Sequence, residues 1–195
     1  MELTADATAT APALLLRPWR TSDATALAEL GGDEAIRRWT SAAVADLADA
    51  ERWLRKQVRG WESGDRLAFA VVETPAGPDG PRLAGHVVLK RGGYGSGMAE
   101  VGYWTAAHAR GRGVAPRALR TLTDWAFTAF AGDGPARLRL LHQIDNTASC
   151  RVAQKCGYDL TAVLPAAPPG FPLEGHLHER PRPEVSPCRA APASP

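Results

Sequence analysis

Hydrophobic positions along residues 14–180 repeat with two different periods, and each period predicts a different kind of element. Short runs that are apolar throughout, or at alternate positions, predict strands, whereas apolar residues three to four apart predict amphipathic helices. In the second predicted helix, for example, Leu47, Leu54 and Trp61 share one face. The predicted strands cover residues 14–19, 67–72, 82–90, 98–105, 137–143, 160–164 and 174–179, and the predicted helices cover residues 21–30, 46–61, 113–130 and 146–156. Strands that alternate with helices after an initial hairpin indicate a mixed α/β sheet.

The two ends of the chain lack this patterning. Residues 1–13 are rich in Ala and Thr and are predicted to form a flexible N-terminus, and residues 181–195 are predicted to form a flexible Pro- and Ala-rich tail. The chain has 195 residues, of which 45% are hydrophobic. This suits a single domain, over residues 14–180, that is large enough to bury a core.

Composition narrows the classes of function. The 23 basic and 21 acidic residues nearly cancel, so no broad basic field for nucleic acid is expected. No run of about 18 apolar residues suits a membrane-spanning helix, and residues 1–13 lack the pattern of a secretory signal. Cys150, Cys156 and Cys188 form no C-x-x-C pair and have no metal-ligand spacing. We therefore expect a reduced, cytoplasmic protein without a membrane partner or a bound metal.

The most informative stretch, residues 110–116, joins a predicted strand to a predicted helix with the sequence Arg-Gly-Arg-Gly-Val-Ala-Pro. The N–H groups at a helix N-terminus lack intrahelical partners, and the helix dipole adds partial positive charge, so such a turn attracts anions. Arg110 and Arg112 add two charges suited to phosphate, and Gly111 and Gly113 let the backbone approach it closely. The chain has no Gly-Lys-Ser or Gly-Lys-Thr, and the third glycine of G-x-G-x-x-G is missing. A phosphate or pyrophosphate site of another kind is predicted, with an ordinary surface turn as the alternative.

Three segments, in order, resemble the GNAT N-acetyltransferase superfamily. Residues 110–115 resemble its acyl-CoA pyrophosphate loop, Gln/Arg-x-x-Gly-x-Gly/Ala. Residues 146–158 resemble the Asn-x-x-Ser segment of the branch that contains the ribosomal-protein N-terminal acetyltransferases, and residues 14–24 resemble the first strand and helix of that branch. The resemblance covers roughly residues 14–180. It implies a mixed, mostly antiparallel sheet with helices on both faces and a splay between two central strands, here residues 98–105 and 137–143.

The resemblance also implies that acetyl-CoA, the acetyl donor, binds across this splay. The pantetheine arm would pair with the strand backbone, and the pyrophosphate would lie on the N–H groups of the loop. Asn146 would contact the pantetheine, cap its own helix, or do both. The cofactor-binding residues predicted in this way are Tyr103, Trp104, Thr105, Arg110, Gly111, Arg112, Gly113, Val114, Ala115, Asn146 and Ser149.

Acetyl transfer needs a neutral amine, and the departing thiolate can take a proton from a donor. Because a thiolate is a good leaving group, catalysis can also rest mainly on proximity. Glu100, on the strand beside the thioester, is the candidate base, with a water chain as the other route and a structural salt bridge as the alternative role of Glu100. Ser149 stands near the place where this branch has its proton donor, with Tyr158 a weaker candidate, although Ser149 could equally support its helix. A strand N–H such as that of Trp104 would hold the oxyanion.

The acceptor site is expected between the first two helices and the last strands. Trp39, Glu100 and His176 are the predicted acceptor-binding residues, with a core position as the alternative for Trp39. His176 and His178 would face one side of a strand, but no third ligand is evident, so no metal is predicted. The Pro-rich residues 165–172 depart from the family pattern, and the prolines after residue 180 are expected to interrupt the last strand.

Together these features predict an acetyl-CoA-dependent N-acetyltransferase that transfers the acetyl group directly to a protein N-terminal amine or a small-molecule amine. One alternative is a non-catalytic acyl-CoA-binding regulatory module, which Glu100 and Ser149 disfavour. Another is a basic protein that binds nucleic acid through the arginines of residues 110–120, which the balanced charge disfavours. Homodimers are common in the resembling family, so a homodimer is left open here.

Overall fold

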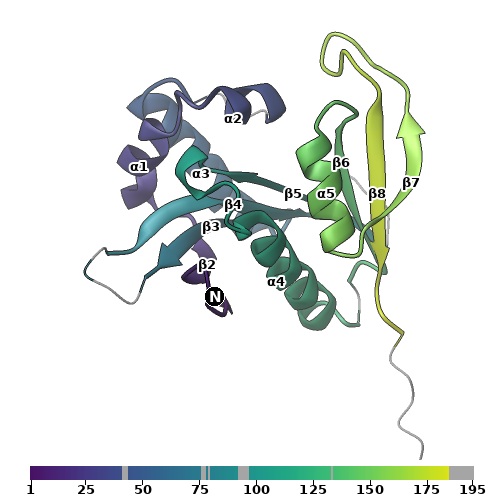
Figure 1. Ribbon diagram of the computed structural model, residues 1–195, viewed down its shortest axis with the longest axis horizontal. Helices are drawn as coiled ribbons and strands as arrows, with labels where there is room; N and C mark the ends of the chain where they lie inside the picture. Colours follow the sequence, from purple (N-terminus) through teal and green to yellow (C-terminus); the bar gives the residue numbers. More distant parts are fainter. Residues whose placement is uncertain (41–43, 76–77, 79, 92–96, 133, 185–195) are drawn as a thin grey trace, which may run out of the picture.

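The computed structural model describes residues 1–40, 44–75, 78, 80–91, 97–132 and 134–184, which form an eight-stranded sheet with helices packed against it (Figure 1). The strands lie in the order β1-β2-β3-β4-β5-β6-β8-β7, and β5 and β6 are parallel whereas the other neighbours are antiparallel. The strands are β1 (Leu3–Ala5), β2 (Ala13–Pro18), β3 (Arg66–Thr74), β4 (Arg82–Lys90), β5 (Met98–Thr105), β6 (Arg137–Gln143), β7 (Asp159–Leu164) and β8 (Gly175–Pro181). The helices are α1 (Ala24–Glu29), α2 (Glu34–Trp39), α3 (Leu47–Ser63), α4 (Val114–Ala129) and α5 (Thr147–Lys155). This confirms the predicted fold class.

Hydrophobic cores lie on both faces of the sheet. On one face, residues of α4 and α5 such as Leu119 and Ala153 pack with Phe69 of β3. On the other face, residues of α1, α2 and α3 such as Leu27 and Leu54 pack against the sheet. Strand β3 is buried from both sides, which explains why its sequence is apolar at successive positions and does not alternate.

The parallel strands β5 and β6 pair only at their beginnings. Met98–Val101 lie opposite Arg137–Leu140, and the pairing stops there, although both strands continue. Each strand stays hydrogen-bonded on its outer side, β5 to β4 as far as Thr105 and β6 to β8 as far as Gln143. In Figure 1 the part of the sheet that contains β6, β7 and β8 accordingly stands apart from the rest. The predicted splay is present, and it leaves the last residues of β5 with an open edge.

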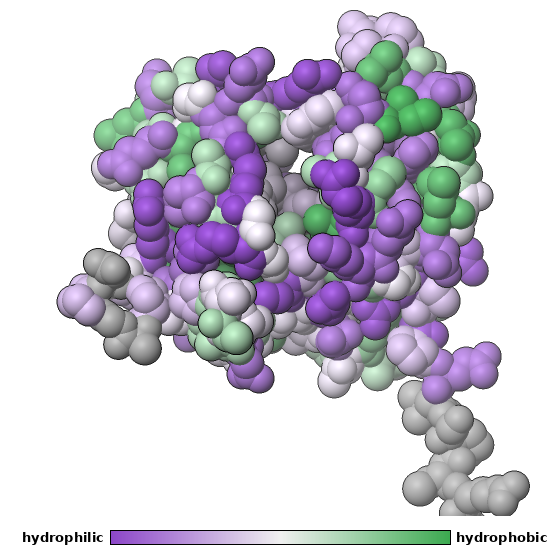
Figure 2. All heavy atoms as spheres, viewed as in Figure 1, coloured by the Kyte–Doolittle hydropathy of each residue, from purple (hydrophilic) through white to green (hydrophobic). Residues whose placement is uncertain are grey.

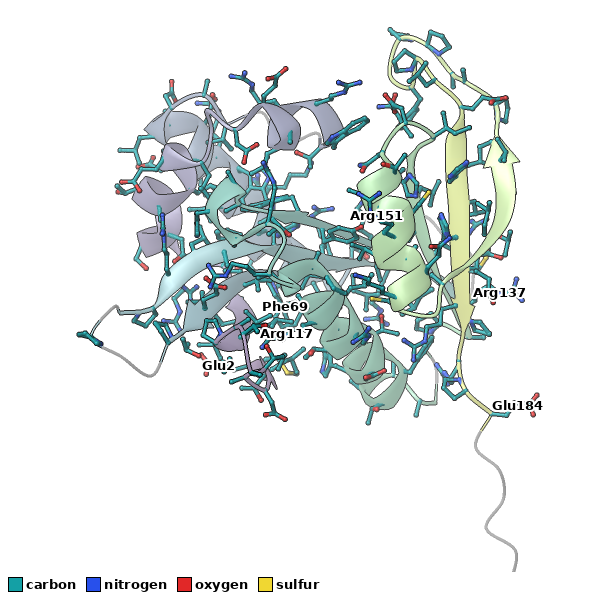
Figure 3. The ribbon with its side chains drawn as sticks, viewed as in Figure 1. Glu2, Phe69, Arg117, Arg137, Arg151 and Glu184 are labelled. Carbon is teal, nitrogen blue, oxygen red and sulfur yellow. The ribbon has the colours of Figure 1, made fainter. Side chains whose placement is uncertain are left out.

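The N-terminal segment differs from the prediction. Residues 3–5, expected within a flexible stretch, form strand β1 and pair with β2. Arg117 of α4 explains why this segment is held, because its guanidinium donates to the carbonyl oxygens of Ala5, Asp6 and Pro12. Figure 3 shows Arg117 beside this end of the chain. A long-range contact of this kind gives no periodic signal in the sequence.

Two further differences concern short or terminal elements. The six-residue helix α2, capped by Asp33, lies where the sequence predicted a loop. The last strand extends through Pro181 and is not interrupted at Arg180, since Pro181 lies opposite Arg137 at the end of β8. Most of the predicted flexible tail, residues 185–195, lies outside the described residues. Within the described ranges, none of the helices has the length and apolar character needed to cross a bilayer.

Candidate active site

A pocket of about 420 Å³ opens where β5 and β6 diverge. It is lined by α2, the end of β5, the loop before α4, the first turn of α4 and one side of α5. Figure 2 shows a hollow with a largely hydrophilic rim between the part of the surface that contains α2 and the part that contains α5. The pocket therefore joins the open end of β5 to the predicted anion-binding loop.

The N-terminus of α4 forms one end of this pocket. Gly111 and Gly113 both have left-handed φ angles, 76° and 73°, which favour glycine, and Gly113 is the N-cap of the helix. No side chain caps the helix there, and Pro116 in the first turn has no N–H to donate. Val114 and Ala115 are the first two residues of this 16-residue helix, and both line the pocket, so their free N–H groups lie at the pocket. This geometry suits a bound anion.

The two arginines of the loop do not present their charges to the pocket as expected. Arg110 lines the pocket, but its guanidinium pairs with Asp33 and donates to the Thr105 carbonyl oxygen. Arg112 is absent from the lining, because its side chain forms an ion pair of 2.7 Å with the buried Glu73 of β3. Both arginines therefore fasten the loop to the neighbouring elements.

Two other cations, Arg151 and Lys155, line the pocket from α5. They are four residues apart and so lie on one side of the helix, and Figure 3 shows Arg151 on the side that faces the gap toward α2. Neither is among the cofactor-binding residues predicted from the sequence. Their helical spacing within the Asn-x-x-Ser segment was the available signal.

The end of β5 supplies two buried polar atoms. The Tyr103 hydroxyl and the Trp104 Nε1 are both buried and have no hydrogen-bond partner among the described residues, and both residues line the pocket. Burial raises the pKa of Tyr103, and the nearby Ser149 side chain opposes that shift only in part. Buried polar atoms without partners are uncommon in folded proteins, so these two atoms, on opposite faces of β5, are candidate partners for polar groups of a ligand.

The beginning of α5 forms the facing wall. Asn146 caps the helix, since its side-chain oxygen accepts a hydrogen bond of 3.2 Å from the Ser149 backbone N–H. The capping role of Asn146 is thereby confirmed, and both residues line the pocket. The side chain of Ser149 lies near the Tyr103 hydroxyl, so hydroxyl groups from α5 and β5 meet at the splay.

Trp39 of α2 also lines the pocket, whereas three other candidate residues do not. The carboxylate of Glu100 pairs with Lys90 on β4, and Glu100 lies four positions before Trp104 on β5, so their Cα atoms are about 13 Å apart. A proton from the pocket would reach Glu100 only through water. Tyr158 is fully buried behind the pocket and bonds to Thr123 at 2.6 Å. His176 faces away from the pocket, toward Cys150.

Aromatic rings behind the pocket fix the indole of Trp104. The Trp104 ring stacks on His86 with a centroid distance of 5.7 Å, and Trp19 contacts both. His86 accepts a hydrogen bond of 3.0 Å from Trp19 Nε1. Burial, followed by the charges of Arg66 and Lys90, lowers the pKa of His86 well below its ordinary value, so the ring is neutral. The wall of the pocket at Trp104 is consequently rigid and apolar on its far side.

The pocket brings together a helix N-terminus, which suits a phosphate group, and the open edge of a strand, which suits an extended ligand with amide groups. The chain matches the family model for the acetyltransferase (GNAT) domain over residues 13–159, which is most of its length, and it belongs to this family. It is therefore an acetyltransferase of the GNAT family, in which acetyl-CoA is the acetyl donor. No curated protein matched the sequence.

Solved structures with the same fold include several acetyltransferases. RimJ of Mycobacterium smegmatis, in complex with CoA-disulfide, is 22% identical to this chain, with a TM-score of 0.74. The match covers 93% of this chain and 86% of the RimJ chain. The microcin C7 self-immunity acetyltransferase MccE, in complex with acetyl-CoA and AMP, is 19% identical, with a TM-score of 0.73. That match covers 86% of this chain and 92% of the MccE chain. RimL, a ribosomal-protein α-N-acetyltransferase in complex with coenzyme A, is 19% identical, with a TM-score of 0.72. Here the match covers 89% of this chain and 95% of the RimL chain.

Proposed function

We propose that the pocket binds acetyl-CoA with its pyrophosphate at the N-terminus of α4 and its pantetheine arm along the open edge of β5. The observation that carries this assignment is the continuity of the pocket, which joins the N–H groups of Val114 and Ala115 to the unpaired end of β5. Pantetheine contains amide groups, which pair with an open strand edge as a further strand would. Arg151 and Lys155 add positive charge for the phosphates.

The bound thioester then lies near Tyr103 and Ser149. The amine nitrogen attacks the thioester carbonyl carbon, the carbon–sulfur bond breaks, and the sulfur leaves with the bonding electron pair. Ser149 donates its hydroxyl proton to that sulfur and regains a proton from solvent, which makes Ser149 the proposed general acid. Its side chain lies near the buried Tyr103 hydroxyl on the facing strand.

The proton that the amine loses travels in the other direction. Glu100 and Trp104 lie on the same face of β5, and the residue between them on that face, Gly102, has no side chain to block the path. We assign Glu100 as the acceptor of this proton through intervening water. Its carboxylate forms an ion pair with the Lys90 ammonium on β4.

The acceptor enters past α2, where Trp39 forms part of the wall. It is a primary amine, either a protein N-terminal amine or a small-molecule amine. Release of free thiol from acetyl-CoA, measured over a panel of N-terminal peptides, polyamines and aminoglycosides, identifies its class. Tight binding of acetyl-CoA without turnover on any amine would favour a regulatory acyl-CoA-binding module instead.

Calorimetric titration of two glycine variants with acetyl-CoA tests the cofactor assignment. Gly113→Glu places a carboxylate at the proposed pyrophosphate site and is expected to abolish micromolar binding of acetyl-CoA. Gly64→Glu is the matched control, because Gly64 has the same φ angle of 73° at the end of α3 but does not line the pocket. It carries the same backbone strain and should bind acetyl-CoA like the wild type. Equal affinity in the two variants would refute the assignment.

A further inference from the structure

Behind α5, away from the pocket, the fold gathers three imidazole rings and a thiol. We call this set the histidine–cysteine cluster, and its members are His142, Cys150, His176 and His178. His142 is at the end of β6 and lies directly opposite His176 of β8, while His178 lies two residues farther along β8 on the same face. Cys150 comes from α5, which lies over these strands in Figure 1.

The spacing of the donor atoms fits a single metal ion. One donor atom from each of the four residues lies within 4.8 Å of all the others. Cys150 Sγ is 3.1 Å from His176 Nδ1 and 3.6 Å from His142 Nε2. A tetrahedral Zn²⁺ with bonds of about 2.0–2.3 Å holds its ligand atoms about 3.3–3.7 Å apart. The cluster therefore needs only small side-chain movements to enclose an ion.

The hydrogen bonds around the rings leave ligand lone pairs directed inward. His178 Nδ1 lies 3.3 Å from the Tyr158 carbonyl oxygen, and His142 Nδ1 lies 2.8 Å from the Gln143 carbonyl oxygen. Carbonyl oxygens only accept, so both rings carry the proton on Nδ1 and keep the lone pair on Nε2. Metal-bound histidines are commonly oriented by this kind of outer hydrogen bond.

His178 provides the observation that points most directly to a missing ligand. The residue is 1% exposed, and its Nε2 is buried without a hydrogen-bond partner among the residues that the structure describes. A buried imidazole nitrogen in this condition is unfavourable unless something binds it. Because His178 Nδ1 already faces the Tyr158 carbonyl oxygen, Nε2 is the nitrogen that His178 has available for the histidine–cysteine cluster, and an ion there would satisfy it.

We propose that the histidine–cysteine cluster is a structural site for one Zn²⁺ ion. Three imidazoles and one thiolate suit zinc and disfavour magnesium and calcium, which prefer oxygen ligands. All four tetrahedral positions would be filled by the protein, which is the pattern of a structural site. The ion would fasten α5 to β6 and β8. Cys150 lies between Ser149 and Arg151, which line the pocket, so the ion would also steady that wall of the cofactor site.

Metal binding to the untagged protein, stripped with a chelator and reduced, tests the proposal directly. Titration with Zn²⁺ against a chromophoric chelator should give one ion per chain with submicromolar affinity. Co²⁺ should give the visible bands of a tetrahedral site together with thiolate-to-cobalt charge-transfer absorption. Zn²⁺ should also protect Cys150 from alkylation, as read by peptide mass spectrometry. Absence of stoichiometric binding, or of the charge-transfer absorption, in the wild-type protein overturns the proposal.

Variants locate the ion. Cys150→Ser and His176→Asn should weaken zinc binding at least 100-fold, and both residues are only partly buried, so their substitution is tolerated better than that of His178. His108→Asn is the control, because His108 lies outside the cluster. Retention of wild-type zinc affinity in Cys150→Ser would refute the site. These readouts do not depend on acetyl-CoA, so they stand apart from the test of the cofactor pocket.

Discussion

The buried neutral ring of His86 predicts that the protein loses stability in mild acid. His86 is 4% exposed and lies among Trp19, Trp53 and Trp104. Protonation would place a charge in this apolar cluster, near Arg66 and Lys90, which are already positive. The unfolded chain has no such restriction, so its His86 takes up a proton near the ordinary pKa of about 6.5.

The sign and size of the effect follow from this difference in pKa. Folding lowers the pKa of His86, so the contribution of this neutral ring to the free energy of unfolding is present above about pH 6.5. That contribution is lost as the pH falls below this value. As the pH falls through about 6.5, the unfolded state takes up a proton at His86 that the folded state does not. The free energy of unfolding should therefore fall by about 1.4 kcal/mol between pH 7.5 and pH 5.5 through His86 alone. This is a substantial share of the roughly 5–15 kcal/mol that stabilises a typical domain.

Urea unfolding of the wild type and of His86→Asn, followed by circular dichroism over this pH range, isolates the contribution. The Asn side-chain oxygen can accept the hydrogen bond from Trp19 Nε1 that His86 Nδ1 accepts, but Asn does not titrate. The other histidines are common to both proteins and cancel. The wild type should be the more stable at pH 7.5, and its advantage should shrink by about 1.4 kcal/mol at pH 5.5. The reasoning would be refuted if the free energies of unfolding of the wild type and of His86→Asn changed equally with pH.

Three substitutions test other parts of the structure. Tyr158→Phe removes the buried bond to Thr123 and should lower the free energy of unfolding by about 1 kcal/mol without changing the acetyl-CoA affinity; reduced affinity in calorimetry would contradict the placement of Tyr158 behind the pocket. Gly85→Ala would bring a Cβ to 2.5 Å from the Trp104 carbonyl oxygen and should cost about 1–3 kcal/mol in denaturant melts; wild-type stability would show that β4 and β5 are less tightly packed than described. Glu100→Gln should lower kcat more than it lowers acetyl-CoA affinity, and a wild-type pH–rate profile would make Glu100 purely structural.

The sheet and its central opening could be predicted from the sequence because each of their signals is local. The apolar runs of β3 and β4 and the helical spacing of α3 and α4 lie within single segments, and the observed boundaries differ from the predicted ones by at most a few residues. The conformation of the loop before α4 was also accessible, because the glycine positions at 111 and 113 require φ angles that other residues avoid. Helix α2 was missed because six residues are too few to establish a period.

The partners of the loop arginines could not be predicted, because they come from distant parts of the chain. Arg110 pairs with Asp33 and Arg112 with Glu73, and no spacing rule links these positions. The same holds for the histidine–cysteine cluster. Its members come from β6, α5 and β8, so the His176 and His178 pair gave no indication of the other two donors. Which side chains meet is decided by the order of strands in the sheet.

The placement of the open edge of β5 has a consequence for self-association. An unpaired strand edge at the border of a sheet is a template on which other chains add strands and aggregate. Here the unpaired edge lies between β5 and β6, in the interior of the sheet, with five strands on one side of it and three on the other. Residues of α2, α4 and α5 wall it in. A polypeptide strand with bulky side chains on both sides does not fit between these walls, whereas a narrow, unbranched ligand does. The unpaired backbone N–H and C=O groups of β5 are thus accessible to a small ligand but not to the strands of other proteins.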